Sequence, residues 1–195
     1  MAYTAIDKPS EHFSVTLYTG DGNYPRAVTG IGFQPDFVWL KNRDVAYWHQ
    51  LYDAVRGAGS TAGAGVVYSN QAAGFDDTYR LTSFDSDGFT LPSALSAKND
   101  SGNSIVAFCW KGANGTASNT DGDFTTTVSA NQTAGFSVLT GTSDAASERN
   151  VGHGLGKIPD VVFARNLVNG YNWDVWFKTT GYTSTELMKL SNLET

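Results

Sequence analysis

The sequence has few of the residues that make cross-links, acid–base pairs or membrane spans. Its one cysteine is Cys109, so no disulfide can form within the chain. Glutamate occurs only four times in 195 residues, and charged residues make up 16%. No apolar run reaches the length of a membrane-spanning helix, and the N-terminus lacks the basic start and apolar segment of a signal peptide. We therefore expect a polypeptide made in the cytoplasm that does not insert into a membrane.

Positive charge is also scarce. The chain has 13 Lys and Arg against 19 Asp and Glu, which gives a net charge of −6. Nowhere do Lys and Arg cluster along the sequence. Because nucleic-acid binding requires a basic face, the charge balance argues against a nucleic-acid partner.

Hydrophobic, aromatic and glycine residues are plentiful, and their arrangement is typical of short strands. Residues 13–19 alternate apolar and polar side chains, as a half-buried strand does. Residues 37–40 form a short apolar run after the turn residues Pro35-Asp36, and residues 104–110 form the most apolar segment, which we expect to be a central strand. Turn signals recur about every 8–12 residues, so the sequence predicts an all-β antiparallel sandwich.

The sequence also repeats itself. Phe13-Ser14-Val15 returns as Phe136-Ser137-Val138, and Pro35-Asp36 returns as Pro159-Asp160. The period of 122 to 124 residues is that of a duplicated domain and not of a solenoid unit. We predict an N-terminal arm at 1–12, a first repeat at 13–112, a linker rich in Gly, Asn and Thr at 113–123, and a second, incomplete repeat at 124–195.

The second repeat is incomplete because it stops before the hairpin and the apolar strand that close the first. A sandwich without its late strands would expose a hydrophobic face and open strand edges. We expect that face to be covered either by a continuation of the natural chain, the interpretation we favour, or by another subunit.

Few residues in the sequence suggest catalysis or metal binding. A glycosidase on a sandwich needs two carboxylates across a cleft, and no glutamate sits in an alternating strand beside a second acid. We therefore predict no catalytic residues and no enzyme activity. Asp85 and Asp87 resemble part of a calcium loop, but the remaining ligands are missing, and a turn with side-chain to backbone bonds explains them as well. We therefore expect no cofactor, and calcium is the alternative that the sequence leaves open.

Aromatic residues occur at matching places in the two copies. Exposed rings can stack on sugar faces, whereas buried rings are the common case in sandwiches. These residues are the candidates for contact with a carbohydrate or receptor, with packing in the core or between subunits as the alternative: Tyr47, Trp48, His49, Tyr171 and Trp173.

Four blocks of the first copy, in order, resemble a repeat of tailed-bacteriophage virion and tail-fibre proteins: residues 32–43 (GFQPDFVWLKNR), 52–57 (YDAVRG), 83–91 (SFDSDGFTL) and 101–111 (SGNSIVAFCWK). Residues 134–138 and 151–156 look like the opening of the next copy. The resemblance covers nearly the whole chain past residue 13. It implies a fold of the concanavalin-A-like (lectin/glucanase) jelly-roll type and a place in the virion.

Three functions follow from these observations. The first is a non-enzymatic virion structural protein, a tail-fibre or tail-appendage subunit that could also adhere to the host surface. The alternatives are a capsid-surface decoration protein and a carbohydrate-binding lectin-like module, while a glycan hydrolase has little support in the sequence. The implied partners are other virion proteins, further copies in a symmetric homo-oligomer, and a glycan of the host surface.

Overall fold

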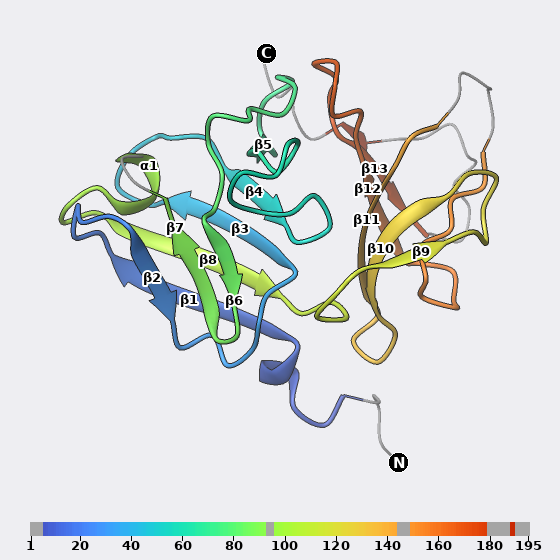
Figure 1. The fold of residues 1–195 in the computed structure, drawn as a ribbon, viewed down its shortest axis with the longest axis horizontal. Coiled ribbons are helices and arrows are strands. Elements are labelled where there is room, and N and C mark those ends of the chain that lie inside the picture. Colours follow the sequence, from blue (N-terminus) through green and yellow to red (C-terminus); the bar gives the residue numbers. More distant parts are fainter. Residues whose placement is uncertain (1–5, 93–95, 144–148, 179–187, 190–195) are drawn as a thin grey trace.

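The computed structural model describes residues 6–92, 96–143, 149–178 and 188–189 of the chain (Figure 1). The first repeat contains two facing antiparallel sheets. The larger sheet comprises, in spatial order, β1 (Phe13–Thr19), β8 (Ser104–Trp110), β3 (Phe37–Asn42), β4 (Gln50–Asp53) and β5 (Val67–Tyr68). The smaller sheet comprises β2 (Arg26–Thr29), β7 (Gly88–Leu91) and β6 (Ser83–Asp85). The predicted all-β antiparallel sandwich is therefore confirmed.

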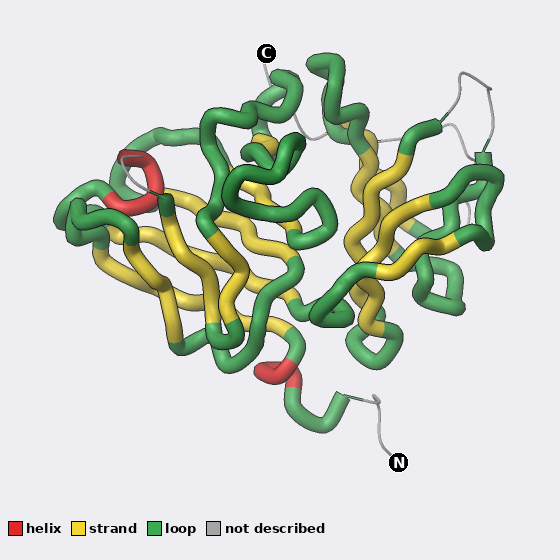
Figure 2. Tube along the Cα trace, in the orientation of Figure 1, coloured by secondary structure: helices red, strands yellow, loops and turns green. Residues whose placement is uncertain are grey.

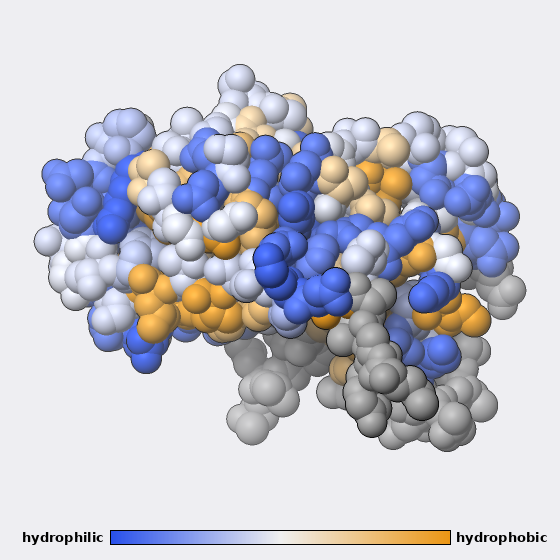
Figure 3. Space-filling view, turned by 90° about the horizontal axis from the view of Figure 1, so that it is seen from below, coloured by the Kyte–Doolittle hydropathy of each residue, from blue (hydrophilic) through white to orange (hydrophobic). Residues whose placement is uncertain are grey.

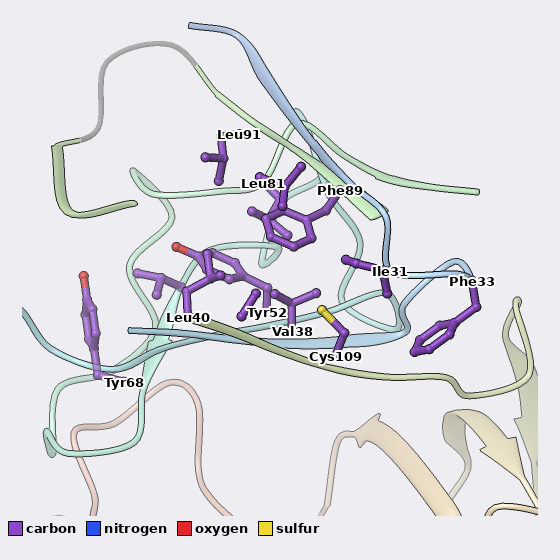
Figure 4. Packing of buried hydrophobic residues seen from close by; sticks show 13 residues of the cluster. Ile31, Phe33, Val38, Leu40, Tyr52, Tyr68, Leu81, Phe89, Leu91 and Cys109 are labelled. Atoms are coloured by element: carbon purple, nitrogen blue, oxygen red, sulfur yellow. The ribbon is translucent and has the colours of Figure 1, made fainter. Parts of the chain in front are cut away.

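The hydrophobic core lies between these two sheets (Figure 4). Cys109 on β8 is fully buried in it, and burial raises the pKa of its thiol to about 12. Cys109 is thus the small buried hydrophobe that its apolar surroundings in the sequence indicate. The larger side chains that meet it from both sheets and their connections include Val28, Val38, Leu40, Tyr52, Leu81, Phe89 and Leu91.

The strand β8 holds the larger sheet together. It pairs antiparallel with β1 along one edge and with β3 along the other. Ile105, Ala107 and Cys109 on it have no exposed surface. The prediction that residues 104–110 form a central strand is confirmed, and the uninterrupted apolar run fits a strand with a buried inward face and half-buried Phe108 and Trp110 on its outward face.

The second repeat contains two further three-stranded sheets. One comprises β11 (Phe136–Gly141), β10 (Thr126–Asn131) and β9 (Ala117–Asn119), and the other comprises β12 (Val161–Ala164), β13 (Asp174–Phe177) and β14 (Met188–Lys189). None of their strands pairs with a strand of the first repeat in the part of the chain that the structure describes. Loops lie between the two groups of sheets (Figure 2).

The hairpins β3–β4 and β12–β13 have the same register. Phe37 pairs with Asp53, and Val161, 124 positions after Phe37, pairs with Phe177 at the same distance from Asp53. Pro35-Asp36 and Pro159-Asp160 precede the two hairpins, and each aspartate carbonyl accepts a bond from the residue just after the partner strand, at 2.8 Å in both. The shared Pro-Asp turn therefore sets the same hairpin in both copies.

The Asp36 carboxylate joins the two copies. It is fully buried, and its Oδ1 accepts a bond from the Ser129 hydroxyl on β10 at 2.8 Å. Its Oδ2 accepts the backbone N–H groups of Gly112 at 2.8 Å and Asn114 at 3.3 Å. The Ser129 hydroxyl oxygen in turn accepts the N–H of Ala113. One carboxylate thus fastens the start of β3, the connection after β8 and the strand β10 to one another.

An aromatic stack lies beside this carboxylate. The ring of Phe136 on β11 lies 6.1 Å from Trp110 with an interplanar angle of 21°, and 6.2 Å from Phe37. Phe13 packs on Trp110 with centroids 4.8 Å apart. Because these rings come from β1, β3, β8 and β11, aromatic side chains of both copies pack together beside the buried Asp36 carboxylate.

The arm and the linker are more structured than the sequence indicates. The predicted arm at residues 1–12 is described from residue 6 onwards, and within it Pro9–Glu11 form a turn of 3-10 helix, η1. His12, which follows it, is bonded through its ring to Asn131 on β10. The predicted linker at 113–123 contains β9, which pairs with β10. Another short helix that local sequence did not reveal is α1 (Ser96–Asn99).

Two edge strands carry exposed apolar side chains. On β1, Val15 and Leu17 are 51% and 62% exposed, and on β12 Phe163 is 52% exposed. On the face that Figure 3 shows, hydrophobic surface lies in separate patches over both ends of the molecule, among hydrophilic residues.

Lys98 on α1 is buried inside the first sandwich. Its side chain is 1% exposed, and its ammonium nitrogen lies 4.8 Å from the ring centre of Tyr52 and 5.9 Å from that of Tyr79. Among the described residues this nitrogen has no hydrogen-bond partner. Burial lowers the pKa of Lys98 to about 7, against a smaller opposing effect of Asp76.

The buried amine of Lys98 should make the free energy of unfolding depend on pH. An unfolded lysine titrates near pH 10.4, so between about pH 7 and 10 the unfolded chain binds more protons and stability rises with pH. Lys98→Met keeps the aliphatic length and removes the amine. We expect the variant to have the higher free energy of unfolding at pH 7. Its advantage over the wild type should shrink by up to ~2 kcal/mol towards pH 9.

Denaturant unfolding of both proteins at pH 7, 8 and 9 measures this gap. The wild-type and variant curves share every other titrating group, including the Cys109 thiol, so their difference isolates Lys98. A gap that stays constant from pH 7 to 9 would contradict the account.

Candidate functional site: an aromatic junction

The structure brings together aromatic residues from the two copies at the end of β5. The ring of Trp48, in the loop after β3, packs edge-on against Tyr68 with centroids 5.1 Å apart. The indole N–H of Trp173, in the loop after β12, donates to the backbone oxygen of Tyr68 at 2.9 Å. We call these three residues, Trp48, Tyr68 and Trp173, the aromatic junction.

The two loops that supply the tryptophans are built in the same way. The Asn42 side-chain oxygen accepts the N–H groups of the residues two and three positions later, and the Asn166 oxygen does the same, all at 3.0 Å. The N–H of Tyr47 donates to Val45, and that of Tyr171 donates to Asn169. Each asparagine thus shapes its loop through a side-chain to backbone turn and directs the aromatic residues that follow.

The second loop rests on the first copy. Arg165 donates from Nη1 to the backbone oxygen of Tyr68 at 2.7 Å and from Nη2 to the backbone oxygen of Ala73. The backbone N–H of Phe75 donates to the Leu167 oxygen at 3.1 Å. A Cβ at Gly170 would lie 2.5 Å from the Ala72 oxygen, so this close approach requires glycine.

Arg165 provides a positive charge beside Trp173. Its guanidinium carbon lies 5.7 Å from the centre of the Trp173 ring, within the range of a cation–π contact. Burial lowers the pKa of Arg165, although an arginine remains protonated at neutral pH. Its Nε has no hydrogen-bond partner within the described parts of the chain.

His49, the residue after Trp48, is held against Trp39. Its Nδ1 accepts a bond from the indole N–H of Trp39 at 2.9 Å, which places the proton of the neutral ring on Nε2. Burial and the nearby Lys41 charge lower the pKa of His49. The backbone N–H of His49 donates to the Asn70 side chain, which ties this loop to the end of β5. The Trp39 bond occupies the nitrogen that a general base would use.

The exposure of these residues decides what the site can do. Trp48 is 47% exposed and Tyr171 is 60% exposed, whereas Tyr68 is buried, and Tyr47, His49 and Trp173 are half-buried. Exposed rings beside polar side chains such as Asn70 can stack on a sugar ring and bond its hydroxyl groups. The candidates from sequence therefore form two groups, the exposed rings of Trp48 and Tyr171 that a ligand can reach and the half-buried rings of Tyr47, His49 and Trp173.

The calcium candidates, Asp85 and Asp87, lie in the β6–β7 hairpin of the first copy, and each carboxylate bonds different partners. The Asp85 carboxylate accepts bonds from the hydroxyls of Ser83 and Thr90, both at 2.7 Å. The Asp87 carboxylate accepts the N–H groups of Gly30 and Gly32, and these bonds lower the pKa of Asp87. Within the described ranges, no three His, Cys, Asp or Glu side chains are grouped to hold a metal ion. The bonds of Asp87 are thus of the side-chain to backbone kind that the turn alternative describes, whereas those of Asp85 are to side-chain hydroxyl groups.

Sequence reasoning missed the buried Asp36 and the contact between the two loops. Pro35-Asp36 stands out as a turn, but nothing local shows that its carboxylate is buried against residue 129. The match between Tyr47 and Tyr171 is visible in the repeat, whereas the meeting of Trp48 and Trp173 at Tyr68 depends on how the copies pack. The structural counterpart of Asp36, Asp160, is exposed and lies 3.7 Å from the Lys178 ammonium.

The fold and the site define an all-β protein of duplicated antiparallel sheets with an aromatic surface site. No helix in the described ranges combines the length and apolar character needed to span a membrane. The chain belongs to the family described as Domain of unknown function (DUF7483), whose model matches residues 8–195. No curated protein and no solved structure matches the chain.

Proposed function

We propose that the protein is a non-enzymatic structural component of a bacteriophage particle, a subunit of a tail fibre or tail appendage. The resemblance of four ordered sequence blocks to tail-fibre proteins supports this proposal, and it also suggests the concanavalin-A-like jelly roll for each copy. The observation that supports it most directly is the contact between the two copies at Asp36. A buried carboxylate and an aromatic stack fasten the two copies to each other, as a rod or knob built from repeats requires.

The bonding of the carboxylates supports a role without catalysis. Asp36 and Asp87 accept backbone N–H groups, and Asp53 forms an ion pair with Arg56 in which both side chains are nearly buried. Asp77 is bonded to Arg80 and to the N–H groups of two glycines. Each of these acids stabilises a turn or loop.

We propose further that Trp48 of the aromatic junction, together with the exposed Tyr171 of the second loop, contacts a glycan of the host surface. Trp48 and Tyr171 present exposed ring surface, and the loops behind them are fixed by the same asparagine turn. A preformed aromatic platform loses little conformational entropy when a flat sugar face binds to it. This role belongs equally to a fibre tip and to a lectin-like module.

The first prediction from this proposal concerns the particle. Quantitative mass spectrometry of purified phage particles should find the chain at a small copy number, a multiple of about three or six, as symmetric appendages have. Hundreds of copies would instead indicate the capsid-surface alternative. Absence from the particles would contradict a structural role in the virion.

The second prediction concerns the exposed tryptophan. Trp48→Ala should weaken binding of the purified protein to host cells by about tenfold, because a stacked ring in a binding site contributes on the order of 1.4 kcal/mol. Leu17→Ala, which shortens a more exposed apolar side chain on β1, is the matched control and should bind as the wild type does.

Circular dichroism and thermal unfolding show whether the variants keep the fold. A folded Trp48→Ala protein that binds host cells as well as the wild type would exclude the aromatic junction as the adhesion site. Enzymatic removal of the cell-surface polysaccharide should abolish the difference between wild type and variant.

A further inference from the structure

The sequence contains two Asn-Gly pairs, Asn114-Gly115 and Asn169-Gly170. In such a pair the backbone nitrogen of the glycine can attack the side-chain amide carbon of the asparagine, because glycine has no Cβ to block the approach. The product is a five-membered succinimide ring. The reaction requires the asparagine side chain and the following peptide group to turn towards each other, so the local structure decides how fast it occurs.

The first pair is free to make this turn. The Asn114 side chain is exposed, and among the residues with described positions neither its amide group nor the N–H of Gly115 has a hydrogen-bond partner. A Cβ built on Gly115 would meet no atom within 4 Å. The bond that Asn114 does make, from its own N–H to Asp36, lies on the other side of its Cα and is not broken by the reaction.

The second pair is held in place. The N–H of Asn169 donates to the Asn166 side chain at 3.0 Å, and its carbonyl accepts the N–H of Tyr171 at 2.9 Å. Gly170 lies so close to Ala72 that a Cβ would be 2.5 Å from the backbone oxygen of that residue. Turning the Gly170 nitrogen towards the Asn169 side chain would break the bond of Tyr171 and move Gly170 from its place beside Ala72.

We propose that Asn114 is a site of spontaneous deamidation, and that its isoaspartate product weakens the contact between the two copies at Asp36. This inference requires neither the virion role nor the glycan site. It rests on the contrast between the free and the held Asn-Gly pair and on the position of the free pair beside the buried carboxylate.

The chemistry needs only water and base. The Gly115 nitrogen gives up its proton to base and bonds to Cγ of Asn114, and the bond from Cγ to the side-chain nitrogen breaks and releases ammonia. Water then opens the ring. Cleavage at Cγ gives aspartate, whereas cleavage at the backbone carbonyl carbon of residue 114 gives isoaspartate, in which the main chain runs through the side chain. Either product has exchanged NH for O, a gain of about 1 Da, and carries one more negative charge at neutral pH.

The isoaspartate changes the segment that Asp36 holds. Asp36 Oδ2 accepts the N–H groups of Gly112 and Asn114, and β9 begins at Ala117, three residues later. Isoaspartate adds one methylene to the main chain between these bonds and β9, and it leaves a free carboxylate on the Cα whose N–H faces Asp36. Because like charges repel, the bond from residue 114 to Asp36 should be lost. The strand β10, which pairs with β9 and bonds Asp36 through Ser129, should then open more often.

The first experiment locates the reaction. The full wild-type chain is kept at pH 8, and peptide mapping by mass spectrometry follows the mass gain at both pairs. Asn114 should react at least about tenfold faster than Asn169 in the folded protein. In denaturant, where the fold no longer holds Asn169, the two sites should react at similar rates. Equal rates in the folded protein, or the same ratio of rates in denaturant, would contradict the structural argument.

The second experiment measures the consequence. Ion-exchange chromatography separates the isoaspartate form by its added charge. Hydrogen exchange of residues 126–131 in this form should be about tenfold faster than in fresh protein, as the loss of one hydrogen bond predicts. Asn114→Gly is the matched control, because glycine keeps the N–H towards Asp36 and adopts the φ of 56° at this position while the reactive side chain is removed.

Two results would overturn the proposed weakening. One is an isoaspartate form whose residues 126–131 exchange as slowly as those of fresh protein. The other is an aged Asn114→Gly protein in which exchange of these residues rises as much as in aged wild type, because the change would then come from another residue. Unchanged exchange in the aged variant, with faster exchange in the isoaspartate form, supports the proposal.

Discussion

The organisation of the molecule depends on one buried carboxylate. Asp36 is placed by the Pro-Asp turn that begins β3, and its backbone is part of the sheet: its N–H donates to Trp110 and its carbonyl accepts from Ala54, both at 2.8 Å. The side chain then reaches across to residues 112, 114 and 129. A charge without solvent is costly unless its bonds are satisfied, and here three donors surround it. The same geometry that forms the hairpin therefore also positions the second copy.

Duplication let one turn serve two purposes. In the first copy the Pro-Asp turn is an internal joint, and in the second copy the same turn lies at the surface with Asp160 beside Lys178. The asparagine loops diverged in a similar way. The first loop holds His49 against Trp39 of its own copy, whereas the second loop extends to the other copy and bonds Trp173 to Tyr68. The aromatic junction arises because both loops reach Tyr68, the first within its own copy and the second from the other copy.

Local pattern was sufficient to predict the strands whose environment is local. The apolar run 104–110 predicted the central strand, and the alternation in residues 13–19 predicted β1. Pattern was also sufficient to pair Tyr47 with Tyr171 as candidates. It could not predict that Lys98 is buried, that Asp36 bonds Ser129, or that residues 117–119 add a strand to β10. These features depend on contacts between distant residues, and burial of a charged side chain contradicts the composition rule that a local reading must use.

The central claim is that the Asp36 carboxylate couples the second copy to the first. Native-state hydrogen exchange of residues 126–131 in Asp36→Asn, compared with Asp160→Asn as the matched control, tests it most directly. Asparagine keeps the shape but turns an N–H₂ group or a neutral oxygen towards the donors, so we expect exchange in β10 to increase in Asp36→Asn and to stay unchanged in Asp160→Asn. Equal protection of β10 in both variants and the wild type would contradict the account.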